Sequence, residues 1–190
     1  ILRSGDSGTS WSDPILVAVG LNEADLLILP GGDWLFVARS EKHDEQAIYA
    51  CRSVDGGRTW AGLQRVTGRA EHPPDLTLLG SGDVLLTFGC RYAPFGVQGL
   101  LSRDGGRTWG ERRLLYADDL PGSDIGYPST VRLDNGRLVT VFYSAGSPER
   151  PFDAYRAVNA FCRAVAGVVG TVHLSRQVEE SGDGLRRAEI

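Results

Sequence analysis

Methionine is absent from the 190 residues, and the chain has one lysine, Lys42, and three cysteines. Residue 1 is Ile1, so we expect the translation start to lie outside this sequence, because a leader was removed or because the chain is a fragment. Cys51, Cys90 and Cys162 are odd in number and widely spaced, which fits neither a disulfide framework nor the paired spacing of a zinc site. We expect these cysteines to pack in the interior.

Long apolar runs and blocks of like charge are also missing. No stretch approaches the roughly 20 apolar residues of a membrane-spanning helix, and no charged-then-apolar leader opens the chain. The formal net charge is −4, with basic residues scattered among acids, so nothing indicates binding to nucleic acid. With 42% hydrophobic residues the chain can bury a core. We expect a soluble protein, secreted or periplasmic if a signal peptide was lost and cytoplasmic otherwise.

A repeated motif is the most informative feature of the sequence. Ser-x-Asp-x-Gly-x-[Ser/Thr]-Trp occurs at 4–11, 53–60 and 102–109, and successive tryptophans of the motif are 49 residues apart. In a hairpin turn the Asp carboxylate can accept hydrogen bonds from N–H groups two or three residues on, and glycine supplies positive φ. The tryptophan then packs into the sheet. A calcium site is disfavoured because an EF-hand loop needs further oxygen ligands and a closing Glu at its twelfth position.

Short apolar or alternating segments fill the intervals between the motifs and predict strands. Hairpin-turn residues separate pairs of these segments at 31–33, 81–83 and 134–136. The expected strands are 26–29, 34–38, 47–51, 76–79, 84–88, 131–133 and 138–142. Each unit of about 50 residues therefore holds about four short antiparallel strands, which is the blade of a β-propeller.

The repeat predicts an all-β fold with about three four-stranded blades. We expect a blade remnant at 1–14, blades at about 15–64, 65–120 and 121–174, and a polar, disordered or partly helical tail at 175–190. Because propellers typically have 4–8 blades, three cannot close a ring. Remaining blades or a second chain are therefore expected to complete it.

Three segments between the motifs carry candidate functional residues. The segment 22–39 has Glu23 near the start of one strand and Arg39 at the end of the next. The segment 72–91 repeats this design and ends in Arg91, in a looser register. The segment 124–143 contains Gly-Tyr-Pro-Ser, with Tyr127 near the start of a strand, and ends in a tyrosine.

With these motifs and segments, residues 1 to about 145 resemble the sialidase (neuraminidase) family of six-bladed Asp-box propellers. The resemblance implies a glycoside hydrolase that releases terminal sialic acid or a related acidic sugar from glycoconjugates, without a cofactor. It implies that Tyr127 is the nucleophile and Glu23 its base, the tyrosine exception among glycosidases. Arg39 and Arg91 would be two members of an arginine triad that binds the substrate carboxylate. A carboxylate that takes the proton of a phenol makes it a better nucleophile at neutral pH.

The chain also departs from the family pattern. Ser144 stands where a Glu often follows the final tyrosine, and Pro128 stands where Ser is usual. The first triad arginine and the acid/base aspartate would lie upstream of Ile1. The sequence as given is therefore not expected to hold a complete sialidase site.

Other interpretations remain open at this stage. The two arginines could pair with a neighbouring blade, Glu23 could be a solvated rim acid, and Tyr127 could pack at a blade edge. The protein could be a non-catalytic propeller that binds glycan or protein, or a propeller hydrolase for another sugar, because a fold does not specify an activity. Four further polar residues at strand edges are interpreted as rim rather than catalytic residues: Tyr92, Asp75, His72 and Asp124. No metal is assigned to His43 or His173.

Overall fold

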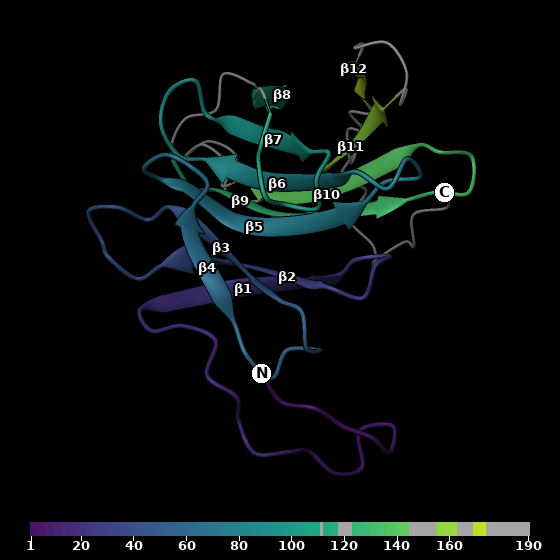
Figure 1. The fold of residues 1–190 in the computed structure, drawn as a ribbon. Coiled ribbons are helices and arrows are strands. Elements are labelled where there is room, and N and C mark those ends of the chain that lie inside the picture. Colours follow the sequence, from purple (N-terminus) through teal and green to yellow (C-terminus); the bar gives the residue numbers. More distant parts are fainter. Residues whose placement is uncertain (111, 118–122, 145–154, 163–168, 174–190) are drawn as a thin grey trace, which may run out of the picture.

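The computed structural model describes residues 1–110, 112–117, 123–144, 155–162 and 169–173. Regular structure in these ranges consists of three four-stranded antiparallel sheets with strand orders β1-β2-β3-β4, β5-β6-β7-β8 and β9-β10-β11-β12, which confirms the all-β prediction (Figure 1). The strands are β1 (Leu21–Ile28), β2 (Trp34–Ser40), β3 (Ile48–Ser53), β4 (Ala61–Arg65), β5 (Glu71–Leu78), β6 (Val84–Cys90), β7 (Gly96–Ser102), β8 (Arg112–Ala117), β9 (Ile125–Arg132), β10 (Leu138–Ser144), β11 (Tyr155–Cys162) and β12 (Val169–His173). No helix in the described ranges is long and apolar enough to cross a membrane. The predicted tail at 175–190 lies outside them.

The first two strands of each sheet are joined by the same tight turn. In the first sheet the Leu29 N–H donates to the Asp33 carbonyl at 2.8 Å and the Gly32 N–H donates to the Leu29 carbonyl at 2.8 Å. Gly32 has φ +87°, which a side chain would disfavour. The same pair of bonds closes the turns at 79–83 and 133–137. Because the three hairpins share this turn, residues of different sheets can be compared by their position relative to it.

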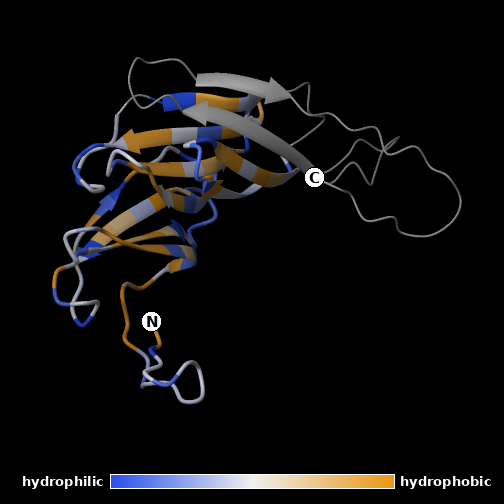
Figure 2. Ribbon diagram, turned by 90° about the vertical axis from the view of Figure 1, so that its right-hand side faces the viewer, coloured by the Kyte–Doolittle hydropathy of each residue, from blue (hydrophilic) through white to orange (hydrophobic). Residues whose placement is uncertain are grey.

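Successive sheets pack face to face through apolar side chains. Between the first two sheets, Leu35 and Val37 of β2 are in one buried cluster with Leu76, Leu86 and Phe88 of β5 and β6. A second cluster joins the second and third sheets and contains Val97, Leu115, Tyr116, Ile125 and Phe142. Figure 2 shows the hydrophobic residues along the strands and the hydrophilic ones mostly in the turns. Truncating a fully buried leucine of this kind typically costs about 2–5 kcal/mol.

Polar bonds also connect the sheets along their first strands. The Asp25 carboxylate on β1 accepts from the Leu76 N–H on β5 at 2.7 Å, and the Asp75 carboxylate on β5 accepts from the Thr130 N–H on β9 at 3.0 Å. Asp25 and Asp75 occupy the same position, each three residues before the end of its strand. The interpretation of Asp75 as a rim residue is therefore wrong, since its carboxylate bridges two sheets.

The repeated motif forms turns, as expected, and its carboxylates are occupied by hydrogen bonds. Asp55 accepts from the backbone N–H groups of Arg58 and Thr59, each at 2.9 Å, and from the Thr59 hydroxyl at 2.7 Å. The N–H groups lie three and four residues on, one farther than expected, because the Ser53 hydroxyl takes the Gly57 N–H at 2.6 Å. The turn at 102–109 has the same bonds.

The tryptophans of the three motifs differ in packing. Trp60 makes an edge-to-face contact with Phe36 at 5.7 Å, and Trp109 packs against the core between the first two sheets. Trp11 is 60% exposed, so the expectation that every motif tryptophan packs into a sheet is wrong there. The reason is that residues 1–20 form no strand against which Trp11 could pack.

Candidate active site

Glu23 and Tyr127 lie at matching irregularities in two of the three sheets. The register of β1 with β2 shifts between Asn22 and Ala24, and that of β9 with β10 shifts opposite the step from Val141 to Tyr143. Glu23 and Tyr127 each stand five residues before the last residue of their strand. Their φ angles are +44° and +50°, in the left-handed region that non-glycine residues seldom adopt. Bulges of this kind redirect a side chain, and such backbone strain often accompanies functional sites.

The two bulges bring Glu23 and Tyr127 into direct contact. The Tyr127 hydroxyl donates to Glu23 Oε1 in a short hydrogen bond. The other carboxylate oxygen, Oε2, forms an ion pair of 2.8 Å with Arg39 Nη1, and Arg39 Nε donates to Asn22 Oδ1 at 2.9 Å. Arg39 is opposite Asn22 in the β1–β2 ladder, so the bulge and the register together assemble the contact. Tyr127 remains 50% exposed and is open to a ligand.

Arg91 joins the same cluster through Tyr143, a residue to which no role was assigned from the sequence. Arg91 directly follows β6, and its Nη2 donates to the Tyr143 hydroxyl oxygen at 3.3 Å. The Tyr143 hydroxyl donates to Asp124 in a short hydrogen bond, and the rings of Tyr143 and Tyr127 lie 5.6 Å apart. The structure thus gathers all four predicted site residues and adds Tyr143, Asp124 and Asn22.

Tyr143 has the place in its sheet that Arg39 has in the first sheet. Each is the sixth residue of the second strand, counted from Leu138 and from Trp34. Arg91 has no such equivalence, because it stands two positions farther along than Gly89, the sixth residue of β6. Arg91 therefore does not occupy the strand position of Arg39. The matching position of Tyr143 and Arg39 in the strand after the hairpin turn is visible in the sequence, and it could have identified Tyr143 as a site residue.

The surroundings of the two phenols in the cluster favour their protonated forms. The hydrogen bond to Glu23 and partial burial raise the pKa of Tyr127, while Arg39 and Arg91 act in the opposite direction. Burial, followed by the hydrogen bond to Asp124, raises the pKa of Tyr143. Tyr127 therefore keeps its proton in the resting site and donates it in a hydrogen bond to Glu23.

His72 and Gly89 lie under the cluster and fix its geometry. His72 is 1% exposed, so its interpretation as a rim residue is wrong, and burial with the nearby Arg91 and Arg39 lowers its pKa to about 4. It is therefore neutral near pH 7. A Cβ added at Gly89 would lie 2.7 Å from Gly126 Cα and 3.0 Å from the His72 carbonyl. The absent side chain at Gly89 lets β5, β6 and β9 approach closely beside Tyr127.

Other sequence candidates lie outside this cluster. Tyr92 donates to the buried Glu71 in a separate contact, and His43 is exposed in the loop after β2. The side chain of His173 lies outside what the structure describes. In the described ranges no group of three His, Cys, Asp or Glu side chains is placed to hold a metal ion.

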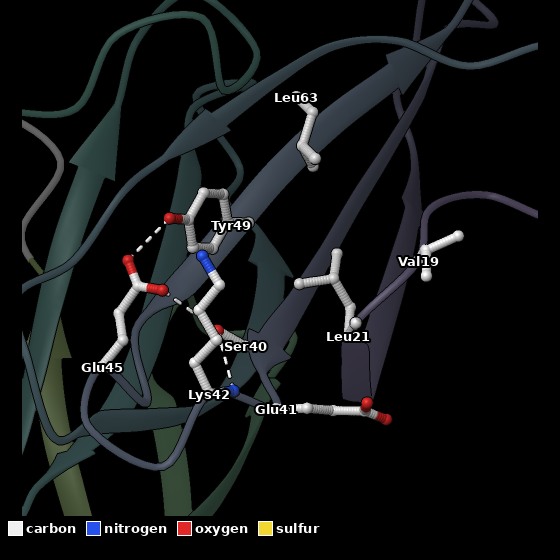
Figure 3. A pocket seen from close by; sticks show the side chains of 9 residues that line it. Val19, Leu21, Ser40, Glu41, Lys42, Glu45, Tyr49 and Leu63 are labelled. Atoms are coloured by element: carbon white, nitrogen blue, oxygen red, sulfur yellow. Dashed lines mark hydrogen bonds between the residues drawn. The ribbon is translucent and has the colours of Figure 1, made fainter.

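A hollow of about 400 Å³ lies on the first sheet. Figure 3 shows Tyr49 pointing at Glu45 on one side of it, and the phenol donates to the carboxylate at 2.7 Å. Ser40 and Leu21 also line it, next in sequence to Arg39 and Asn22. None of the four predicted site residues lines the hollow, so it is distinct from the cluster.

The fold defines the class of protein to which the chain belongs, a β-propeller with four-stranded antiparallel sheets as its blades. The model of the BNR repeat-like domain matches residues 1–141, and the chain belongs to this family. Comparison with curated proteins finds no match.

Several solved structures share the fold. A protein of unknown function from Dyadobacter fermentans is 28% identical, with a TM-score of 0.67 over 77% of this chain and 41% of that one. The Penicillium chrysogenum α-L-arabinanase complexed with arabinobiose is 16% identical, with a TM-score of 0.69 over 91% and 57%. The α-L-arabinofuranosidase of Fusarium graminearum complexed with arabinobiose is 19% identical, with a TM-score of 0.64 over 84% and 53%. The chain thus spans about half the length of these structures.

Proposed function

We propose that the protein is a glycoside hydrolase that releases a terminal acidic sugar, such as sialic acid, by nucleophilic attack of Tyr127. The observation that carries the proposal is the hydrogen bond from the Tyr127 hydroxyl to Glu23. A phenol attacks poorly while it keeps its proton, and a carboxylate within hydrogen-bond distance can remove that proton in the transition state. Among the described residues Glu23 is the one hydrogen-bond partner of the Tyr127 oxygen, so a lone pair remains for attack.

The proposed reaction has two steps. In the first, Tyr127 Oη bonds to the anomeric carbon, its proton passes to Glu23, and the glycosidic C–O bond breaks. The leaving oxygen takes a proton from a general acid that the proposal does not assign to a residue of this chain. In the second step water attacks the anomeric carbon and gives a proton to that acid, and Tyr127 leaves and regains its proton from Glu23. A neutral phenol avoids the repulsion between an attacking carboxylate and an anionic sugar.

Arg39 and Arg91 are proposed to bind the carboxylate of the sugar. Guanidinium groups bind carboxylates through paired N–H···O bonds. Both arginines are close enough to lower the pKa of Tyr127 and of the buried His72, which supports a common positive field over the site. The neutral His72 contributes no charge to that field near pH 7.

A second candidate is hydrolysis of a neutral pentose oligosaccharide. The observation that favours it is the fold shared with an arabinanase and an arabinofuranosidase, each solved with arabinobiose. The alternative of a non-catalytic binding propeller, which the sequence left open, predicts binding without turnover.

The ring itself is proposed to be completed by further blades or by a second chain. Leu26 and Ile28 on the free face of β1 are 36% and 55% exposed, whereas the equivalent Leu76 on β5 is 8% exposed under the first sheet. A four-stranded blade packed on this face would bury them in the same way. Sedimentation should show self-association of this chain alone. A monodisperse monomer without affinity for a hydrophobic dye contradicts the proposal.

The activity test compares fluorogenic sialoside and α-L-arabinofuranoside with the ring complete. Hydrolysis of the sialoside that Tyr127→Phe abolishes, and that Tyr49→Phe leaves intact, is the expected result. Tyr49 is a matched control because its phenol also donates to a glutamate, away from the site. Equal rates for wild type and Tyr127→Phe exclude Tyr127 as the nucleophile. Turnover of the arabinoside alone supports the second candidate.

A further inference from the structure

The site contains a second tyrosine–carboxylate pair, and its contacts differ from those of Tyr127. The Tyr143 hydroxyl donates to Asp124 and its oxygen also accepts from Arg91 Nη2 at 3.3 Å. The Tyr127 oxygen has Glu23 as its partner and no guanidinium donor in the described part of the chain. Tyr143 is thus held on both sides, which suits an anchoring group better than a nucleophile.

The orientation of Arg91 depends on its hydrogen bond to Tyr143, whereas the orientation of Arg39 is supported by two contacts. Arg39 is held by Glu23 and by Asn22. Among the described residues no carboxylate forms an ion pair with Arg91, and its Nε is buried without a partner. Its guanidinium passes over Gly126, where an added Cβ would lie 3.5 Å from Nη2. Among the described residues, the hydrogen bond to Tyr143 is therefore the side-chain contact that orients the Arg91 guanidinium.

We infer that Tyr143, polarised by Asp124, is the residue that positions Arg91 for the substrate carboxylate. The inference rests on the proposed function, since it assigns the carboxylate to Arg91. A hydroxyl that donates to a carboxylate is a better acceptor, because consecutive hydrogen bonds polarise one another. The interposed neutral phenol orients Arg91 while leaving its charge available to a ligand.

The first experiment measures the positioning of Arg91 without a ligand. Phenylglyoxal modifies accessible arginines, and peptide mapping gives the rate at each one. Tyr143→Phe keeps the aromatic ring and removes the hydroxyl, so we expect the rate at Arg91 to rise at least three-fold while that at Arg39 is unchanged. Asp124→Asn should cause a smaller rise, and Tyr49→Phe none. Equal rates at Arg91 in wild type and in Tyr143→Phe overturn the inference.

The second experiment measures binding of N-acetylneuraminate and of its uncharged methyl ester by calorimetry, with the ring complete. Loss of one hydrogen bond to a charged group should weaken binding of the acid about 10-fold in Tyr143→Phe and leave the ester unaffected. In hydrolysis the same variant should raise KM while kcat changes less than about two-fold. A fall in kcat at constant KM overturns the positioning role. If the rate at Arg91 rises in Tyr143→Phe but the wild type binds neither probe, the positioning of Arg91 is supported and the proposed substrate is refuted.

Discussion

Glu23 and Tyr127 are 104 residues apart, yet each is the bulge residue at the same position of its sheet, and their side chains are hydrogen-bonded to each other. Both have the left-handed backbone conformation, which costs an L-residue about 1–2 kcal/mol. The fold retains this strain twice, at the two residues that the proposed reaction needs most. In the remaining sheet the equivalent position is that of Pro73 on β5. Pro73 follows a cis peptide bond and carries neither a carboxylate nor a hydroxyl.

Loss of the proposed base, Glu23, is predicted to lower the rate of hydrolysis strongly, as loss of the nucleophile Tyr127 does. Glu23→Gln keeps the size of the side chain and the bulge but removes the proton acceptor and the ion pair with Arg39. We expect kcat for a sialoside to fall about 10²- to 10⁴-fold, as when a general base is lost. Thermal melting should show whether the variant remains folded, and a folded variant with wild-type kcat contradicts the assignment.

Gly89→Ala is predicted to destabilise the protein and disorganise the site. The new Cβ would meet three backbone atoms at 2.7–3.0 Å, in Gly126, Ile125 and His72, and backbone cannot move aside as a flexible side chain can. Overpacking of this kind typically costs about 1–3 kcal/mol, measured by urea denaturation. Gly31→Ala is the control, because a Cβ at Gly31 meets nothing within 4 Å. Similar midpoints for the two variants would show that the close approach does not limit stability.

Asp75 is predicted to make stability depend on pH. Burial and then repulsion from Asp25 raise its pKa to about 6 from 3.8, against hydrogen bonds from Thr130 and Thr87 that act in the opposite direction. A raised pKa means that the protonated form favours folding, so the contribution is full below pH 3.8 and is lost as pH rises through about 6. Asp75→Asn should remove this slope and stabilise the protein by about 1–2 kcal/mol at pH 7, allowing for partial exposure.

Urea denaturation between pH 3.5 and 7.5 measures this effect. Asp13→Asn, in the exposed N-terminal segment, serves as the control for loss of a negative charge. A wild-type curve that parallels that of Asp75→Asn throughout the range excludes Asp75 as its source.

The aspartates of the repeated turns are predicted to differ in importance. Asp55→Ala removes the acceptor of two N–H groups and two hydroxyls in a turn whose Gly57 packs on Trp34, whereas the Asp6 carboxylate accepts from one N–H group and two hydroxyls. Asp55→Ala should lower Tm clearly, whereas Asp6→Ala, in the turn whose tryptophan is exposed, should lower it less. Hydrogen bonds from Ser10 and Ser4 lower the pKa of Asp6 to about 2, so its contribution is lost only as pH falls below 3.8. Equal changes in Tm in the two variants would show that packing of the turn does not determine its contribution to stability.

The sequence alone determined the turns, the hairpins and the all-β repeat. The Asp55 turn is closed by bonds within seven residues, and the 29–33 turn within five, so residue type and spacing suffice to predict them. The segments containing Glu23, Arg39, Arg91 and Tyr127 were also identified, through their resemblance to a known family.

Only the tertiary structure decided how these residues meet and which others join them. The bulge at Tyr127, the orphaned Arg91 Nε and the hydroxyl of Tyr143 between Arg91 and Asp124 depend on how three sheets pack. His72 and Asp75 were placed wrongly at the rim because alternation along a strand does not show which face a neighbouring sheet covers. Contacts between strands more than 50 residues apart depend on a single inserted residue, and a bulge leaves no local hydrogen-bonding signature in the sequence.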